Sequence, residues 1–200
     1  MMKIVGILGG VASGKSLVAE QLRHFGAKVL DADKVGHQVL LEPEVIQAVR
    51  ERWGDVVFGE DGQINRSQVA KIVFTQTADG REQLSFLEQL THPRIGKKLR
   101  EEIDRTLQED DTRVLILDAP VMLKAGWDRL CDYIVFVDVP HDIRLNRAKT
   151  RGWRDEDFAA REAAQESLDA KRAAATNIID NSGSIESTLR QVESFWQSLD

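Results

Sequence analysis

The sequence has little cysteine and lacks any long apolar run. Cys131 is the single cysteine among 200 residues, which excludes an internal disulfide framework. No apolar stretch approaches the ~20 residues of a membrane-spanning helix, and the first residues, MMKIVGILGG, show no cleavable signal pattern. The four histidines are scattered, and with a single cysteine they form no metal-ligand spacing pattern. We therefore expect a cytoplasmic protein that has no membrane partner.

An excess of positive charge is also absent. Lys and Arg number 27 against 33 Asp and Glu, and the net charge of -6 argues against a nucleic-acid partner. The segment from His141 to Arg154 is different, because it has a cluster of basic residues and one nearby acid, Asp142. Such a segment is either a solvated helix face or a site for a small anionic ligand. Its basic residues are Arg144, Arg147, Lys149, Arg151 and Arg154.

Short apolar runs predict buried parallel strands. They lack the strict alternation of a half-exposed strand, as expected for strands that are covered on both faces. Helical patterns lie between them, so the chain predicts an α/β sheet with right-handed crossovers. The runs are residues 3–8, 28–30, 114–117, 133–137 and 177–179.

An aspartate directly follows each of these runs except the first. Ligands bind at the carboxyl ends of strands in open α/β sheets, so these acids lie where chemistry is expected. Some are expected to form turns or caps instead, Asp138 and Asp180 above all. The aspartates are Asp31, Asp118, Asp138 and Asp180.

Two long stretches interrupt the strands. Residues 35–111 have helical apolar spacing, as in EVIQAVRERWG and REQLSFLEQL, and predict a helical insert. Residues 142–175 predict two lid helices joined near RGWRDED. Residues 1–34, 112–141 and 176–200 then form the core. Its last helix has an expected apolar face of Ile185, Leu189, Val192 and Trp196.

The segment GGVASGKS contains the phosphate-binding pattern G-x-x-x-x-G-K-[ST], between a predicted strand and a predicted helix. Glycines let backbone N–H groups surround phosphate oxygens, and Lys15 neutralises the outer phosphates. The hydroxyl of Ser16 is a candidate Mg²⁺ ligand. The pattern begins at Gly9, and the expected ATP-binding residues are Gly10, Val11, Ala12, Ser13, Gly14, Lys15, Ser16 and Leu17.

The motif alone does not distinguish a kinase from a switch GTPase or a motor ATPase. The guanine-specific pattern N-K-x-D is absent from the late segments VDVPHD and NIIDNSG, and no L-S-G-G-Q signature occurs. These absences favour a small-molecule kinase. A non-catalytic nucleotide-binding switch stays as the alternative of another class.

Such a kinase needs an acceptor-side base, a second carboxylate and cations over the moving phosphoryl group. Asp33, in LDAD, is the candidate base, and Asp118, in LILDAP, is the candidate for the metal shell or the acceptor. Arg144, Arg147 and Arg151 share one helical face and are candidates for a lid over ATP. Each of these residues is also open to a plain capping or ion-pairing role.

The order and spacing of the motifs resemble the dephospho-CoA kinase family over nearly the whole chain. This resemblance implies a three-layer P-loop kinase fold with a five-stranded parallel sheet, a helical acceptor-binding insert and a lid. It also implies ATP-dependent phosphorylation of the ribose 3′-hydroxyl of dephospho-CoA with Mg²⁺, by a monomer or weak homo-oligomer. The similar segments are GILGGVASGKS, VLDADKVGHQV, WGDVVFGEDGQINRSQVAKIVF, LEQLTHPRI, LILDAPVMLKAGW, RLNRAKTRGW and REAAQESLDAKRAAATNIIDNSGS.

The resemblance implies roles on the nucleotide side. Asp33 is similar to the family's catalytic base, and Lys15 and Arg147 are similar to its phosphate-stabilising cations, with Arg151 in support. The segment DNSGS resembles the part near the adenine of ATP. Ala12 stands where the family usually has glycine, and its small side chain should still allow a close backbone approach.

The resemblance also implies an acceptor site at His92, Arg94 and Asp118. His92 is equally open to a capping or turn role before Pro93. Lys124 reverses a charge that the family usually has on the acceptor side. For that reason a kinase that acts on another small alcohol or nucleotide stays as the alternative.

Overall fold

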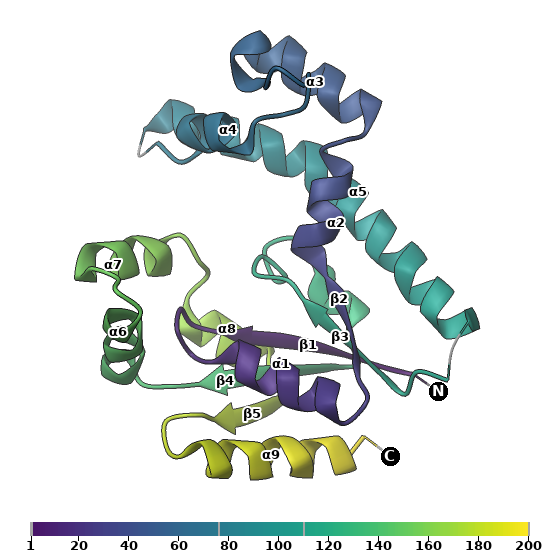
Figure 1. Ribbon diagram of the computed structural model, residues 1–200, viewed down its shortest axis with the longest axis vertical. Coiled ribbons are helices and arrows are strands. Elements are labelled where there is room, and N and C mark those ends of the chain that lie inside the picture. The colour runs from purple at the N-terminus through teal and green to yellow at the C-terminus, as the bar shows by residue number, and fades with distance from the viewer. Residues whose placement is uncertain (1, 76, 110, 200) are drawn as a thin grey trace. The chain divides into compact units, whose positions relative to one another are not determined.

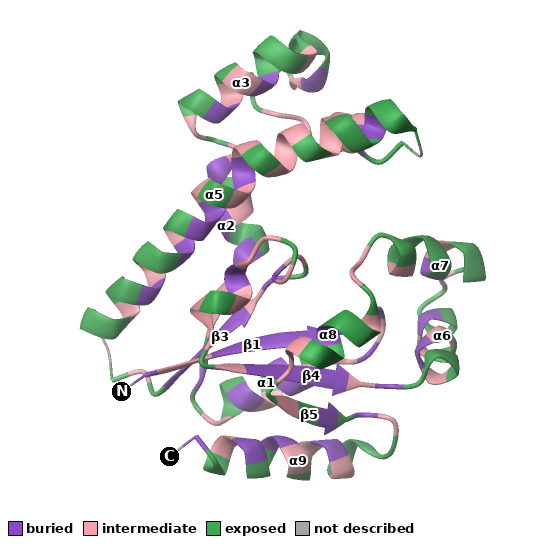
Figure 2. Cartoon of the chain, turned by 180° about the vertical axis from the view of Figure 1, so that it is seen from behind, coloured by how far each residue is buried: buried purple, intermediate pink, exposed green. Residues whose placement is uncertain are grey.

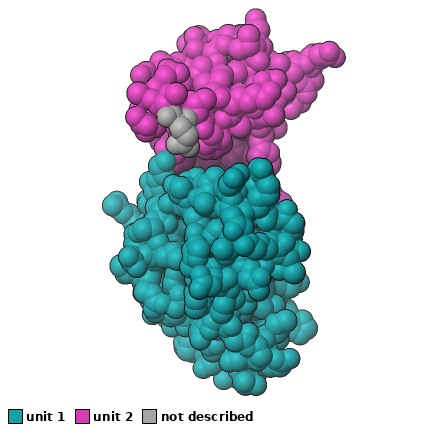
Figure 3. All heavy atoms as spheres, turned by 90° about the vertical axis from the view of Figure 1, so that its left-hand side faces the viewer, with its two compact units in different colours: residues 1–31, 102–200 teal, residues 32–101 magenta. Residues whose placement is uncertain are grey.

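The computed structural model describes residues 2–75, 77–109 and 111–199, and the chain divides into two compact units (Figure 3). The first unit consists of residues 1–31 and 102–200, and the second of residues 32–101. Within the described residues, no helix combines the length and the apolar character that crossing a bilayer requires.

The first unit contains a five-stranded parallel sheet with the order β2-β3-β1-β4-β5 (Figure 1). All five predicted strands are present, and each extends one residue further than the apolar run that predicted it. In four of them this last residue is the expected aspartate. The expected burial holds for the three inner strands but was wrong for the two edge strands, β2 and β5, where Ile179 alone is buried. The strands are β1 (Lys3–Gly9), β2 (Lys28–Asp31), β3 (Val114–Asp118), β4 (Tyr133–Asp138) and β5 (Asn177–Asp180).

Helices cover this sheet on both faces, which confirms the three-layer α/β architecture. Figure 2 shows β1 and β4 buried along most of their length, as two-sided cover requires. The helices of the first unit are α1 (Lys15–His24), the end of α5 (Ala78–Glu109), η2 (Trp127–Leu130), α6 (His141–Thr150), α7 (Asp155–Ala163), α8 (Leu168–Ala174) and α9 (Ile185–Gln197).

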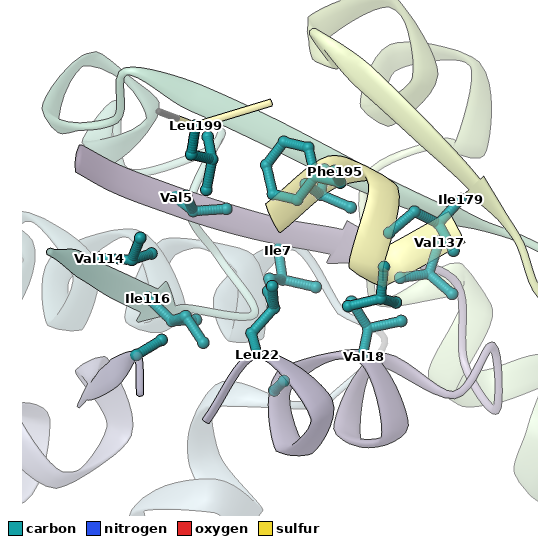
Figure 4. Packing of buried hydrophobic residues seen from close by; sticks show 14 residues of the cluster. Val5, Ile7, Val18, Leu22, Val114, Ile116, Val137, Ile179, Phe195 and Leu199 are labelled. Atoms are coloured by element: carbon teal, nitrogen blue, oxygen red, sulfur yellow. The ribbon is translucent and has the colours of Figure 1, made fainter. Parts of the chain in front are cut away.

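The main core lies between the sheet and helices α1 and α9. Val5 and Ile7 of β1 pack with Val18 and Leu22 of α1 and with Phe195 of α9 (Figure 4). Burying one such side chain stabilises the fold by about 1.5–3 kcal/mol. On the opposite face the smaller cluster consists of Met2, Ile103 and Leu115.

The segment predicted as two lid helices contains three. Helix α8 begins after Ser167, whose hydroxyl accepts a hydrogen bond from Ala170 N at 3.1 Å. A serine at this position is a strong helix start signal. The expectation of two helices over 142–175 was therefore wrong, because the polar segment contains a second N-cap.

The second unit is helical, as predicted. Trp53 packs edge-on against Phe86, and its indole nitrogen donates to Gln83 Oε1 at 2.9 Å, which joins α3 to α5. Its helices are α2 (Ala32–Val39), α3 (Pro43–Trp53), η1 (Asp55–Val57), α4 (Arg66–Val73) and the larger part of α5.

Helix α5 continues through Pro93, so neither a cap nor a turn forms there. Proline removes one backbone donor inside a helix. Nearby side chains donate to carbonyls of the same helix: Thr91 Oγ1 to Leu87 O at 2.8 Å and Arg94 Nη1 to Leu90 O at 2.7 Å. The capping or turn reading of the preceding histidine is excluded by this continuity.

Candidate active site

The loop between β1 and α1 is the predicted phosphate-binding turn (Figure 1). Its backbone is left-handed at Ala12, with φ 58°, and at Gly14, with φ 90°. A Cβ atom at Gly14 would lie 2.3 Å from Asn181 Nδ2, and one at Gly10 would lie 2.8 Å from Arg144 Nη1. Helix α1 begins directly after this tight turn, so its N-terminal amides and positive dipole end lie where an anion binds.

Ser13 holds a polar group inside this loop. Its side chain is 1% exposed, and Oγ has no hydrogen-bond partner among the residues that the structure describes. A buried hydroxyl without a partner costs free energy. A ligand oxygen at this position would remove that cost.

Lys15 places its ammonium over the start of the loop. Nζ donates to Gly9 O and to Gly10 O, both at 3.4 Å. Burial lowers the pKa of Lys15, the negative charge of Asp118 raises it and the charge of Arg144 lowers it further. Hydrogen bonds of 3.4 Å are long and weak, so the ammonium can leave these carbonyls for a phosphate.

The three arginines expected on one lid face have different surroundings. Arg144 is 1% exposed, donates to Val139 O at 3.0 Å and Val11 O at 3.3 Å, and pairs with Glu162. It supports the loop from inside the fold. Arg151 is exposed and lies just beyond α6.

Arg147 contacts the loop and the end of β5 together. Its guanidinium donates to Ser13 O at 3.4 Å and to Asn181 O at 2.8 Å. These contacts form one side of an open pocket at the phosphate loop. The pocket is lined by Ala12, Gly14, Leu17, Arg147, Thr150, Arg151, Asn181 and Ile185.

Asn181 joins the elements around this pocket. Nδ2 donates to Ser13 O at 2.8 Å, Oδ1 accepts from Thr188 Oγ1 at 2.8 Å, and the side chain is almost fully buried. The family resemblance pointed to the segment DNSGS, which contains Asn181, but it gave this residue no role of its own. A further signal was its place directly after a strand-end acid, Asp180, at the edge where ligands bind.

The aspartates at the strand ends divide into two groups. Asp31 and Asp118 are register partners of neighbouring strands. Asp138 forms an ion pair with Arg172. Asp180 Oδ1 accepts from the amide of Ser182 at 2.8 Å, and hydrogen bonding from the side chain and the amide of Ser182 lowers the pKa of Asp180. The turn role predicted for Asp180 is therefore confirmed, whereas Asp138 forms an ion pair in place of the predicted turn or cap.

The remaining predicted residues lie in the second unit. Asp33 is exposed in the first turn of α2, two residues after β2 ends. His92 and Arg94 lie in α5, and Arg94 pairs with Glu42 at 3.7 Å. Lys98 also contacts Glu42, at 3.2 Å. The first unit thus contains the phosphate loop, the arginines of residues 144–151 and the acid at the end of β3. The second unit contains Asp33, His92 and Arg94.

The oxygen donors near the loop fit Mg²⁺. In the described part of the chain, no group of three or more His, Cys, Asp or Glu side chains is arranged to hold a metal ion. Mg²⁺ bound with a nucleotide needs few protein ligands, because phosphates and water supply the others. Ser16 is exposed at the start of α1, and the negative charge of Asp118 raises the pKa of Lys15.

A parallel sheet of this order, with a lysine-bearing phosphate loop after β1 and with Arg147 of α6 at that loop, defines a P-loop kinase. Comparison with known proteins identifies the kind of kinase. A family model described as dephospho-CoA kinase matches residues 3–187, and the chain belongs to this family.

Individual relatives agree with this assignment. The dephospho-CoA kinase of Carboxydothermus hydrogenoformans is 37% identical over 194 residues, which cover 96% of this chain and 92% of the relative. A Thermus thermophilus protein of known crystal structure has 30% sequence identity to this chain and a TM-score of 0.80. The match covers 100% of this chain and 98% of that one. The Campylobacter jejuni dephospho-CoA kinase shares the fold, with a TM-score of 0.74 at 24% identity and the same coverage.

Proposed function

We propose that this chain transfers the terminal phosphoryl group of ATP to the ribose 3′-hydroxyl of dephospho-CoA, which yields coenzyme A and ADP. The observation that carries the proposal is the position of Lys15, held weakly at two loop carbonyls at the N-terminus of α1, in a chain of this family. A cation in that position neutralises transferred phosphates.

On the nucleotide side, residues 10–17 bind the phosphates of ATP. The orphan hydroxyl of Ser13 and the helix N-terminus after Gly14 support this role. Arg147 offsets the charge on the moving phosphoryl group, and Arg151, which lines the same pocket, supports it. Residues 142–175 act as the lid that brings these arginines to ATP.

Asp33 acts as the catalytic base. It takes the proton of the acceptor hydroxyl while the bond from that oxygen to the terminal phosphorus forms and the bond from phosphorus to ADP breaks. Its exposed position after β2, at the carboxyl edge of the sheet, supports this assignment.

His92, Arg94 and Asp118 bind the acceptor. Residues 35–111 form the acceptor-binding insert, and residues 1–34, 112–141 and 176–200 form the nucleotide-binding core. The pairing of Arg94 and Lys98 with Glu42 supports an anion-binding role, because an anionic group of the acceptor can replace that carboxylate.

Ser16 is the proposed Mg²⁺ ligand, with Asp118 near it. The bound ion would neutralise charge on the β- and γ-phosphate oxygens. Ser16 fits because its hydroxyl is a hard oxygen donor in the first turn of α1.

The test measures ADP release with dephospho-CoA, adenosine, a nucleoside monophosphate and a sugar acid as separate acceptors. We expect turnover with dephospho-CoA and a product phosphorylated at the ribose 3′ position. If the protein phosphorylated one of the other acceptors and not dephospho-CoA, that acceptor would be the substrate. Tight ATP binding with no phosphorylated product would instead favour the nucleotide-binding switch.

The variant Asp33→Asn tests the base. We expect kcat to fall by roughly 10²–10⁴-fold, while the affinity for ATP stays unchanged. Asp180→Asn is the matched control, because an amide oxygen can still accept from the Ser182 amide. Full activity of Asp33→Asn, or an equal loss in both variants, would refute the assigned role.

A further inference from the structure

A buried lysine of α8 lies against the start of the phosphate loop. The side chain of Lys171 is 2% exposed, although lysine is rarely buried unless it is paired. Nζ donates to Gln165 Oε1 at 2.7 Å and to Gly9 O at 3.4 Å. Gly9 is the last residue of β1, so this ammonium reaches the strand end from which the loop begins.

Lys171 and Lys15 share one acceptor. Lys15 Nζ also lies 3.4 Å from Gly9 O, so both ammonium groups donate to the same carbonyl oxygen. A carbonyl oxygen has two lone pairs and can accept both bonds. When Lys15 moves from the carbonyl to a phosphate, Lys171 remains as a donor to it.

Two other residues, Arg144 and Leu168, contact the loop backbone next to Gly9. Arg144 donates to Val11 O at 3.3 Å. A Cβ atom placed on Gly10 would lie 3.0 Å from Leu168 Cδ2 in the first turn of α8. Helix α8 therefore contacts the start of the loop through both an apolar side chain and the buried ammonium. Through these contacts the position of α8 affects the position of the loop backbone.

The charges of the two lysines favour the movement of Lys15 from the shared carbonyl oxygen to a phosphate. Burial lowers the pKa of Lys171, and the charge of Lys15 lowers it further, while Glu166 and Glu162 raise it. The two ammonium groups thus repel each other across one oxygen. A phosphate beside Lys15 relieves this repulsion, because an anion favours the charged form of a nearby lysine.

We propose that Lys171 is a positioning residue for nucleotide binding, which keeps the Gly9 carbonyl paired and the loop in shape when Lys15 leaves that carbonyl for the phosphates. The inference rests on the proposed binding of ATP by this loop. Lys171 acts through Lys15 and makes no contact with the nucleotide.

The experiment measures the dissociation constant of ATP, without acceptor, by calorimetric titration. Lys171→Met keeps the length of the side chain and removes its charge. We expect ATP to bind about tenfold more weakly, because the departure of Lys15 would leave a buried carbonyl without a donor. The KM for dephospho-CoA should stay within about twofold, which separates this role from a general loss of structure.

Arg172→Met is the matched control, since it removes a cation from the next residue of the same helix, where the partner is Asp138 at the end of β4. We expect wild-type ATP affinity in this variant. Gln165→Leu is a second variant, which releases the Lys171 ammonium without removing it. It should weaken ATP binding less than Lys171→Met does.

A double-mutant cycle decides between acting through Lys15 and acting directly. In a Lys15→Met background, Lys171→Met should cause no further loss of ATP affinity. Additive losses would overturn the proposal in favour of a direct phosphate contact, and unchanged affinity in the single variant would overturn it outright. Wild-type protein that binds ATP but does not phosphorylate dephospho-CoA would refute only the proposed function, whereas failure to bind ATP would refute both.

Discussion

Replacing Asn181 by alanine should separate the stability of the fold from the shape of the phosphate loop. The amide side chain makes two buried hydrogen bonds of 2.8 Å, one to Ser13 O and one from Thr188 Oγ1. Its backbone oxygen accepts from Arg147 at 2.8 Å. The loop, the end of β5, α9 and Arg147 therefore meet at one residue, and the loop and α9 bind its side chain.

The expected loss follows from these contacts. Each buried hydrogen bond contributes about 0.5–1.5 kcal/mol, and a buried group left without a partner costs about 1–3 kcal/mol. Thr188 Oγ1 can turn to Ser184 O at 3.3 Å, but Ser13 O keeps only the long bond from Arg147 at 3.4 Å. Asn181→Ala should thus lower the free energy of unfolding by about 2–4 kcal/mol.

The assay combines urea unfolding with ATP titration. Thr188→Val is the control, because it breaks the bond to Oδ1 and leaves the bond from Nδ2 to Ser13 O intact. Both variants should lose stability, but only Asn181→Ala should weaken ATP binding, by about tenfold. Equal ATP affinities in the two variants would refute the argument that Asn181 shapes the loop.

Two further predictions concern other parts of the first unit. Gly14→Ala should abolish measurable ATP binding, because its Cβ would meet Asn181 Nδ2 at 2.3 Å at a φ of +90°; wild-type affinity in calorimetry would contradict this. Burial, with added repulsion from Asp128 and Asp132, raises the pKa of Cys131 to about 12, so iodoacetamide at pH 8 should alkylate the folded protein at least about a hundredfold more slowly than the urea-unfolded chain. As the pH rises toward that pKa the thiolate fraction and the rate should increase, and a flat rate from pH 8 to 10 would refute the assigned cause.

The sheet could be predicted because its strands are specified locally. A run such as YIVFV is buried on both faces wherever it lies in a parallel sheet, so its composition alone indicates the structure. Helix boundaries were less predictable. A cap or turn at His92, before Pro93, was one of two open readings, but α5 continues through Pro93, since tertiary packing can outweigh the loss of one hydrogen bond. Ile185 fits the apolar pattern of α9, yet it is 59% exposed beside the pocket at the phosphate loop.

In the candidate site, too, some residues are identified by a local sequence motif, and others only by contacts between distant parts of the chain. Lys15 was identifiable because the chemistry of the loop requires glycines and a lysine at fixed spacing within a few residues. Lys171 follows an alanine and precedes Arg172 in a short polar helix, where a lysine ordinarily faces water. Its contact with Gly9 joins residues 162 positions apart, and only the crossing of α8 over the end of β1 creates it. Lys171 and Asn181 both lie in the segment REAAQESLDAKRAAATNIIDNSGS, which resembles the family's pattern of Gln, Lys and Asn-Gly around the last strand. That resemblance gives neither residue a role, so their contacts with the loop follow only from burial and hydrogen bonding.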